Sequence, residues 1–181
     1  MNPLQIIKKY YKIDSKAYKI IVGHSQAVTK KALSIAKKVP HLNPDLNFIA
    51  EASMLHDIGI FLTDAPAIEC FGKLPYICHG YLGRKIIAQE GFPNHALVCE
   101  RHVGVGLSLK EIEEQKLPIP KRDMLPISVE EQVICLADKF FSKNQPELSQ
   151  EKSLDQIRAG LLKYGHNKVL IFNTWVKIFE I

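Results

Sequence analysis

Apolar residues recur every three or four positions along most of the chain, which is the pattern of amphipathic helices. No stretch alternates apolar and polar residues over the length of a strand, and no segment repeats. Proline, glycine and capping residues divide the pattern into separate helices. The predicted helices cover roughly residues 3–11, 15–38, 44–57, 76–89, 94–102, a brief segment from 109, 129–140, 154–164 and 167–179. The sequence therefore predicts an all-α fold, a bundle of eight or nine helices.

The predicted helix starts depend on short polar side chains that accept hydrogen bonds from the first free N–H groups. Asn43, followed by Pro44, and Asn94, which closes a turn, are each predicted to be an N-cap. Ser-x-x-Glu capping boxes at 108–111 and 128–131 predict two more helix starts. The proline-rich stretch between these boxes is expected to be an irregular loop, either over a site or as a plain connection.

Length and composition are those of a globular protein. A chain of 181 residues is long enough for one sizeable core and short for two, so a single domain over 1–181 is expected. No apolar run approaches the roughly 20 residues that span a bilayer. Lys8 and Lys9 interrupt the apolar start of the chain, so no secretory segment is expected and a cytoplasmic location is predicted. The four scattered cysteines are expected to be reduced and packed as small hydrophobes.

The formal net charge of +5 indicates a mild preference for anionic partners. Most of the excess comes from lysines in the first forty residues. Solvated helix faces are the ordinary explanation of such lysines, and electrostatic guidance of a polyphosphate or nucleotide is the second interpretation. Arginines interleaved with aromatic residues, the usual sign of a nucleic-acid surface, are absent, so nucleic acid is not an expected partner.

His56 and Asp57 are the most unusual pair in the sequence, because they end an apolar helical run and are followed by Gly59. A carboxylate at the edge of a core must be paired, hydrogen-bonded or bound to a cation. In the ordinary interpretation the pair is a helix end, where the imidazole faces the negative end of the helix dipole and Gly59 stops the helix. Asp138 raises the same question, because it interrupts the apolar face of its predicted helix.

Four histidines and two aspartates stand out, all on separate predicted helices except one adjacent pair. They are His24, His56 with Asp57, His79, His102 and Asp138. A single histidine of this kind fits a core imidazole bonded to a carbonyl group. Together, imidazole and carboxylate ligands from several helices are the means by which bundles build metal sites. This chemistry favours one or two divalent ions per chain, such as Fe, Mn, Zn, Co or Mg. Three histidines have no place in the pattern and are expected not to be ligands: His41, His95 and His166.

The order of His24, the His-Asp pair and Asp138 resembles that of the HD superfamily of metal-dependent phosphohydrolases. The His-Asp-Ile-Gly form found here is frequent in that superfamily. The resemblance covers about 21–143. It implies an HD helical bundle, with the C-terminal helices over 153–179 packed on the motif-bearing core.

Two further histidines resemble a binuclear branch of the superfamily, which includes bacterial symmetrical diadenosine-tetraphosphate hydrolases. His79 is followed by Gly80 and Gly83, and His102 is followed by Gly104. In that branch, one ion is held by the residues that match His24, His56, Asp57 and Asp138. The second ion is held by those that match His79 and His102, with the aspartate that matches Asp57 bridging both.

The chain departs from other branches of the superfamily. Ile60 stands where the cyclic-dinucleotide phosphodiesterase branch usually has a lysine, and the segment 80–82 lacks that branch's Gly-Tyr-Pro signature. Arg101 with His102 replaces its double histidine. Ile60 also occupies the place of an acidic residue of the mononucleotide phosphatase branch, which argues against monophosphate removal by that mechanism. The group that protonates the leaving group stays unassigned.

The resemblance implies hydrolysis of a phosphoester or phosphoanhydride bond in a small anionic, nucleotide-like substrate, with a dinucleoside polyphosphate as one candidate. Two cations about 3.5–4 Å apart can share a water and lower its pKa towards neutrality. Asp57 and His56 are the expected catalytic residues, and Arg101 and Lys139 are the basic residues expected first to bind substrate phosphate. A non-catalytic metal-binding nucleotide sensor and a di-iron oxygenase of the HD type are the alternatives.

The last predicted helix carries an apolar stripe along one face. It consists of Phe172, Trp175, Val176 and Phe179. Docking of this stripe on the bundle is the first interpretation, and a contact in a homodimer is the second.

Overall fold

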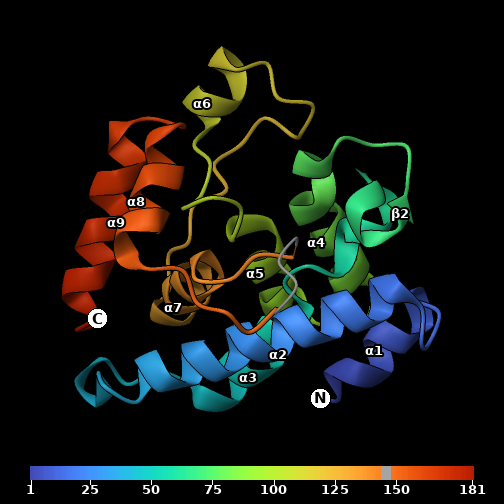
Figure 1. Ribbon diagram of the computed structural model, residues 1–181, viewed down its shortest axis with the longest axis horizontal. Helices are drawn as coiled ribbons and strands as arrows, with labels where there is room; N and C mark the ends of the chain where they lie inside the picture. Colours follow the sequence, from blue (N-terminus) through green and yellow to red (C-terminus); the bar gives the residue numbers. More distant parts are fainter. Residues whose placement is uncertain (144–147) are drawn as a thin grey trace.

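The computed structural model describes residues 1–143 and 148–181, which form a helical bundle (Figure 1). The α-helices within these residues are α1 Pro3–Tyr10, α2 Lys16–Ala36, α3 Leu46–Leu55, α4 His79–Gln89, α5 Pro93–Arg101, α6 Leu109–Glu114, α7 Val129–Lys139, α8 Leu154–Leu162 and α9 His166–Ile178. The predicted all-α bundle of eight or nine helices is confirmed. The stretch between the predicted helices over 129–140 and 154–164 includes residues 144–147, which lie outside the described residues. In the two described ranges, no helix is both long and apolar enough to cross a bilayer.

Short elements connect the α-helices. The 3-10 helices are η1 Pro40–Leu42, η2 Ile58–Leu62, η3 Pro66–Ile68 and η4 Tyr76–Cys78. Between η2 and η4, β1 Asp64–Ala65 pairs antiparallel with β2 Cys70–Phe71. These strands were not predicted, because two residues are too few for an alternating pattern to develop.

The two predicted capping boxes, at 108–111 and 128–131, are present with both of their hydrogen bonds. A third box at 153–156 begins α8 and uses glutamine in place of glutamate. In each box the serine side chain accepts a hydrogen bond from a backbone N–H that would otherwise have no partner in the first turn.

The two asparagine N-caps were wrong. The α3 helix is capped by the carboxylate of Asp45, whereas Asn43 ends η1 in the left-handed region with φ of 51°. Asparagine tolerates the left-handed conformation better than most residues, so Asn43 forms the turn that ends η1 instead of capping α3. The α5 helix begins at Pro93, so Asn94 is already helical.

Two apolar clusters fill the bundle, and both α2 and α3 run through them. On α2, Ile21 belongs to one cluster and Val28 to the other, and His24 lies between these residues. On α3, Ala52 and Leu55 are divided between the clusters in the same way. A buried polar layer therefore lies between the clusters, formed by His24, Ser25, Ser53, His56 and Asp57.

The α8 and α9 helices stand side by side at one end of the bundle (Figure 1). Phe172, Trp175 and Phe179 of the predicted stripe are buried in the same apolar cluster as residues of α7. Val176 is half-buried against the same cluster. The stripe thus packs within the chain, as the first interpretation expected. The homodimer stays a prediction, and no surface of the chain is assigned to it.

Gly59 lets η2 lie against α4. A Cβ at this position would stand 2.3 Å from the carbonyl oxygen of His79 and 2.5 Å from the backbone nitrogen of Gly83. Gly59 has no positive φ, so the helix-stopping conformation considered for it was wrong. Its role is to allow the close approach of the backbone that carries His79.

We expect Gly59→Ala to lower the free energy of unfolding by about 3 kcal/mol, because the added methyl would collide with backbone atoms on two sides. The matched control is Gly160→Ala in α8, where an added Cβ has no described atom within 4 Å apart from its chain neighbours and the backbone of its own helix. That change should raise the free energy of unfolding by about 0.5–1 kcal/mol through better helix propensity. Urea denaturation followed by circular dichroism measures both, and effects of the same sign would contradict the packing argument.

Candidate metal centre

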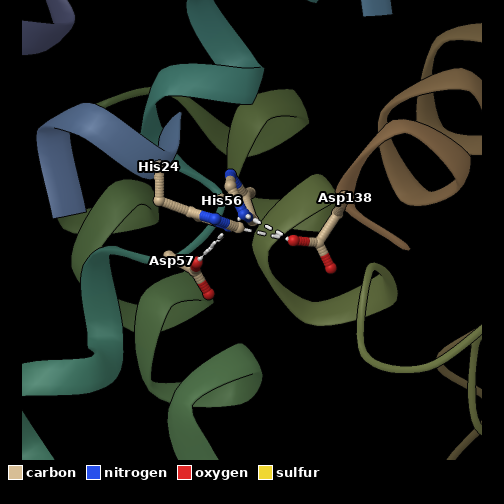
Figure 2. Close-up of side chains that lie close together, drawn as sticks. All are labelled: His24, His56, Asp57 and Asp138. Carbon is tan, nitrogen blue, oxygen red and sulfur yellow. Dashed lines mark hydrogen bonds and ion pairs between the residues drawn. The ribbon is translucent and has the colours of Figure 1, made fainter. Parts of the chain in front are cut away.

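Four of the predicted ligands meet in the polar layer (Figure 2). His24 comes from α2, His56 and Asp57 from the end of α3, and Asp138 from α7. The Nε2 atom of His24 lies 3.0 Å from Oδ1 of Asp138 and 3.3 Å from Oδ2 of Asp57. The Nε2 atom of His56 lies 3.0 Å from Oδ2 of Asp57 and 3.5 Å from Oδ1 of Asp138. We call these four residues the first ligand set; their ligand atoms all lie within 4.8 Å of one another.

The remaining two predicted ligands approach the other oxygen of Asp57. The Nε2 atoms of His79 and His102 lie 3.6 Å and 3.4 Å from Oδ1 of Asp57, and 3.1 Å from each other. His79 is the first residue of α4, and His102 caps the end of α5. Asp57, His79 and His102 form the second ligand set. Asp57 therefore presents one oxygen to each set, which is the arrangement of a bridging carboxylate.

Backbone carbonyl groups orient three of the imidazoles. The Nδ1 atoms of His56, His79 and His102 lie 2.6, 2.7 and 2.8 Å from the carbonyl oxygen three residues earlier in the chain. Donation from Nδ1–H to these oxygens fixes the orientation of each ring and leaves its Nε2 facing Asp57. The sequence could not reveal these acceptors, because they are backbone groups that become available only at helix ends.

Burial and nearby charge oppose each other in the site. Burial disfavours the ionised forms of Asp57 and Asp138, but the neighbouring cationic side chains outweigh it and hold the pKa of both carboxyls well below its usual range. Burial lowers the pKa of His79 to about 3 and also lowers that of His102. For His56, the Asp57 carboxylate outweighs burial and raises the pKa to about 9. The second ligand set thus holds neutral imidazoles, the form that binds metal ions, whereas a cation at the first set would replace a proton on His56.

Spacing and chemistry both fit divalent cations. Metal–ligand bonds of about 2.0–2.2 Å place neighbouring ligand atoms about 3.0–3.6 Å apart, which agrees with the separations in both sets. Oδ1 of Asp57 and Nε2 of His56 are buried, and no described residue gives them a hydrogen bond of good geometry. Leaving such atoms unpaired is costly, and a cation between the ligands removes that cost. The two sets are therefore suited to hold divalent cations.

Lys143 is a functional candidate that the sequence analysis did not single out. Its Nζ atom lies 2.6 Å from Oδ2 of Asp57, and its side chain is 13% exposed. Lys139 lies 2.8 Å from Oδ2 of Asp138, on the side turned away from His24 and His56. The sequence offered one indication of this role: Lys143 lies a few residues after α7, the helix that carries Asp138.

An open cavity of about 820 Å³ adjoins the ligand sets. Asp138 belongs to its wall, and β1, η3 and the α8 helix form other parts of it. The lysines that line the cavity are Lys139, Lys143, Lys152 and Lys163. Such a lining favours a ligand with several negative charges.

The two residues predicted to bind substrate phosphate differ in their surroundings. Lys139 lines the cavity, as expected of such a residue. Arg101 is not among the lining residues, and its Nη1 lies 2.7 and 3.0 Å from the two carboxylate oxygens of Glu131. Glu131 also serves in the capping box of α7. Phosphate binding by Arg101 stays a prediction that this pairing does not support.

The residues expected not to be ligands lie outside both sets. His95 instead pairs with Glu51 at 3.1 Å, and His41 and His166 are exposed. All four cysteines are buried and free. Cys135 is the nearest in sequence to Asp138; burial raises the pKa of its thiol to about 12, and the thiol donates to the carbonyl oxygen of His102. It is therefore a protonated packing residue.

The fold and the two ligand sets define an all-α metal-binding protein of the His/Asp type. The family model described as "HD domain" matches residues 21–142, which is 122 of the 181 residues. The chain belongs to the HD domain family. The resemblance proposed from His24, His56, Asp57 and Asp138 is thereby confirmed at the level of the family.

Relatives of the chain carry two kinds of name. A tRNA (cytidine(56)-2'-O)-methyltransferase of Thermoplasma volcanium is 28% identical over 82% of this chain and 38% of its own length. One of the same name from Picrophilus torridus is 28% identical over 70% of this chain and 33% of its own length. An uncharacterized protein of Methanocaldococcus jannaschii is 29% identical over 84% of this chain and 85% of its own length. The chain thus spans little more than a third of the methyltransferases. No solved structure matches significantly.

Proposed function

We propose that the protein is a metal-dependent phosphohydrolase that cleaves a phosphoester or phosphoanhydride bond of a nucleotide-like substrate. The observation that carries the proposal is the position of Asp57, whose two oxygens face two separate ligand sets. A lysine-lined cavity beside those sets supplies room and positive charge for a phosphorylated ligand. Membership of the HD family supports the hydrolase class.

Bound divalent cations would supply Lewis-acid charge to a phosphoryl group and lower the pKa of a water towards neutrality. The protein's own residues would hold the reactants. Asp57 would fix the spacing of the two ligand sets, and His56 would be kept in place by its bond to a backbone carbonyl. Lys139 and Lys143 would donate hydrogen bonds to phosphoryl oxygens from the cavity wall.

The narrower form of the proposal is a dinucleoside polyphosphate as substrate and two cations per chain. The second ligand set supports two cations, because its histidines approach the oxygen of Asp57 that the first set leaves free. The cavity volume supports a large substrate, since ligand sites of this size hold whole organic molecules. Four free cysteines fit the cytoplasmic location that we propose with it.

A substrate panel tests the proposal. Dinucleoside polyphosphates, nucleoside triphosphates, mononucleotides and simple phosphodiesters are each incubated with Mn, Fe, Co, Mg or Zn, and products are separated by ion-exchange chromatography. We expect phosphate-bond cleavage of at least one nucleotide polyphosphate, dependent on added metal and lost on chelation. Oxygen consumption without phosphate release would indicate the di-iron oxygenase instead. Nucleotide binding by the metal-loaded protein without turnover would indicate the sensor.

The methyltransferase name does not lead to a second proposal. The chain aligns with only 38% and 33% of those two relatives, and its site is built of imidazoles and carboxylates suited to cations. We propose that methyl transfer is not the reaction of this segment. Incubation with tRNA and a methyl donor, under conditions in which the Thermoplasma volcanium relative is active, is expected to leave the tRNA unmethylated.

A further inference from the structure

The α8 helix builds a wall of the cavity from residues outside the family match. Ile157, Gly160 and Leu161 line the cavity from α8, and Tyr164 lines it from just beyond the helix end. The match to the HD domain ends at residue 142. The metal ligands therefore belong to the family segment, whereas this wall is an addition made by the C-terminal part of the chain.

Gly160 has no conformational or packing role in the helix. It has no positive φ. Apart from its chain neighbours and the backbone of its own helix, no described atom lies within 4 Å of the Cβ that another residue would carry there. A glycine inside a helix lowers stability relative to alanine, so such a position calls for another explanation. Because Gly160 lines the cavity, the space that it leaves open is cavity space.

The cavity has an apolar side and a cationic side. The apolar side includes the exposed Pro66 and the ring of Tyr164, which is 71% exposed, together with the mostly buried Ile157 and Leu161. An exposed tyrosine ring beside aliphatic side chains is a surface on which a nucleobase can stack. A ligand that covers this side has an apolar, ring-bearing part.

The cationic side contains Lys139, Lys143 and Lys152. Lys152 is half-buried, and its Nζ has a carbonyl oxygen, that of Phe141, as its hydrogen-bond acceptor at 3.4 Å. Burial lowers the pKa of Lys152; the Asp138 carboxylate opposes this shift, and the positive charges of Lys139 and Lys143 add to it. Lys139 and Lys143 pair with Asp138 and Asp57. Cations bound at the ligand sets would neutralise those carboxylates, and the three ammonium groups would then favour a ligand with several negative charges. The ligand therefore carries more than one negative charge.

We propose that α8 sets the substrate specificity of the site: Gly160 keeps open the space for the nucleoside, while a di- or polyphosphate chain lies along Lys139, Lys143 and Lys152. This inference rests on the proposed function. It goes further by assigning recognition of the organic part to residues outside the metal centre. Specificity then depends on a helix that contributes no metal ligand.

The test compares two diphosphonates with a carbon bridge in place of the anhydride oxygen, so that binding is read without turnover of an anhydride. These are α,β-methylene-ADP and methylenediphosphonate, which differ by the adenosine group. Isothermal titration calorimetry on the Mn-loaded protein is expected to show at least tenfold tighter binding of α,β-methylene-ADP. In Gly160→Phe the added ring fills the nucleoside space, so that preference should fall below threefold while the affinity for methylenediphosphonate changes less than twofold.

The matched control is Leu162→Phe, on the same helix but outside the cavity lining and 48% exposed. It should keep the affinities of the parent protein for both probes. Circular dichroism checks folding, and if Gly160→Phe does not fold, Gly160→Met, with a good helix former, replaces it. Equal affinity of the unmodified protein for the two probes, or equal losses in the control, would overturn the inference. If the substrate panel shows no hydrolysis but the probes behave as expected, the site recognises nucleotides and only the proposed reaction fails.

Discussion

Replacing Asp57 by alanine is expected to empty both ligand sets and to reduce hydrolysis at least about 10³-fold, roughly 4 kcal/mol of transition-state stabilisation. Asp57 is the one residue common to the two sets. Its Oδ2 lies within 3.3 Å of both His24 and His56, and its Oδ1 faces His79 and His102. Alanine therefore takes a charged ligand from each cation at once, whereas any other single change leaves one set intact.

Metal content by mass spectrometry and turnover on the best substrate of the panel measure this effect. Asp155→Ala is the matched control, because that side chain is 90% exposed and pairs only with Arg158 of the same helix; metal content and turnover should not change. Asp57→Asn, which keeps the shape of the side chain, guards against a folding defect. A folded Asp57→Asn protein that retains two ions and full activity would show that Asp57 does not bridge.

The fold was largely readable from the sequence because helices leave a periodic signal. Ser108 and Ser128 marked helix starts through side-chain chemistry that acts within three residues. The N-cap predictions failed where the same side chain stabilises more than one local structure. Asn43 suits both an N-cap and a left-handed turn, and only the neighbouring Asp45 decides between them. Elements of two residues, such as β1 and β2, fall below what periodicity can resolve.

The candidate site was predictable only in part, for a physical reason. A buried histidine or aspartate breaks an apolar face and can be noticed in one dimension. Lys143 breaks no pattern, since a lysine just after a helix is ordinary, and only the packing of α7 against α3 brings it to Asp57. Gly160 also breaks no pattern in the sequence, because its proposed role depends on the empty cavity space beside it. Residues whose role depends on neighbours far away in the sequence can therefore be recognised only in the three-dimensional structure.

Replacing His79 by alanine is expected to lower the metal content from two ions per chain to one and to reduce turnover about 10²-fold or more. His79 contributes only to the second ligand set. The four residues of the first set keep their contacts of 3.0–3.5 Å, so that set should retain its ion. Titration with Mn followed by calorimetry counts the sites, and His41→Ala, at an exposed position outside both sets, is the matched control.

The two substitutions together separate one-ion from two-ion chemistry. If a single ion carried the reaction from the first ligand set, His79→Ala would keep full turnover whereas Asp57→Ala would lose it. If two ions act as a unit, each change should remove most of the activity, but only Asp57→Ala should remove both ions. Loss of both ions in His79→Ala would instead mean that the sets bind cooperatively. The separate oxygens of Asp57 favour independent binding, because each set retains its own imidazoles when the other is empty.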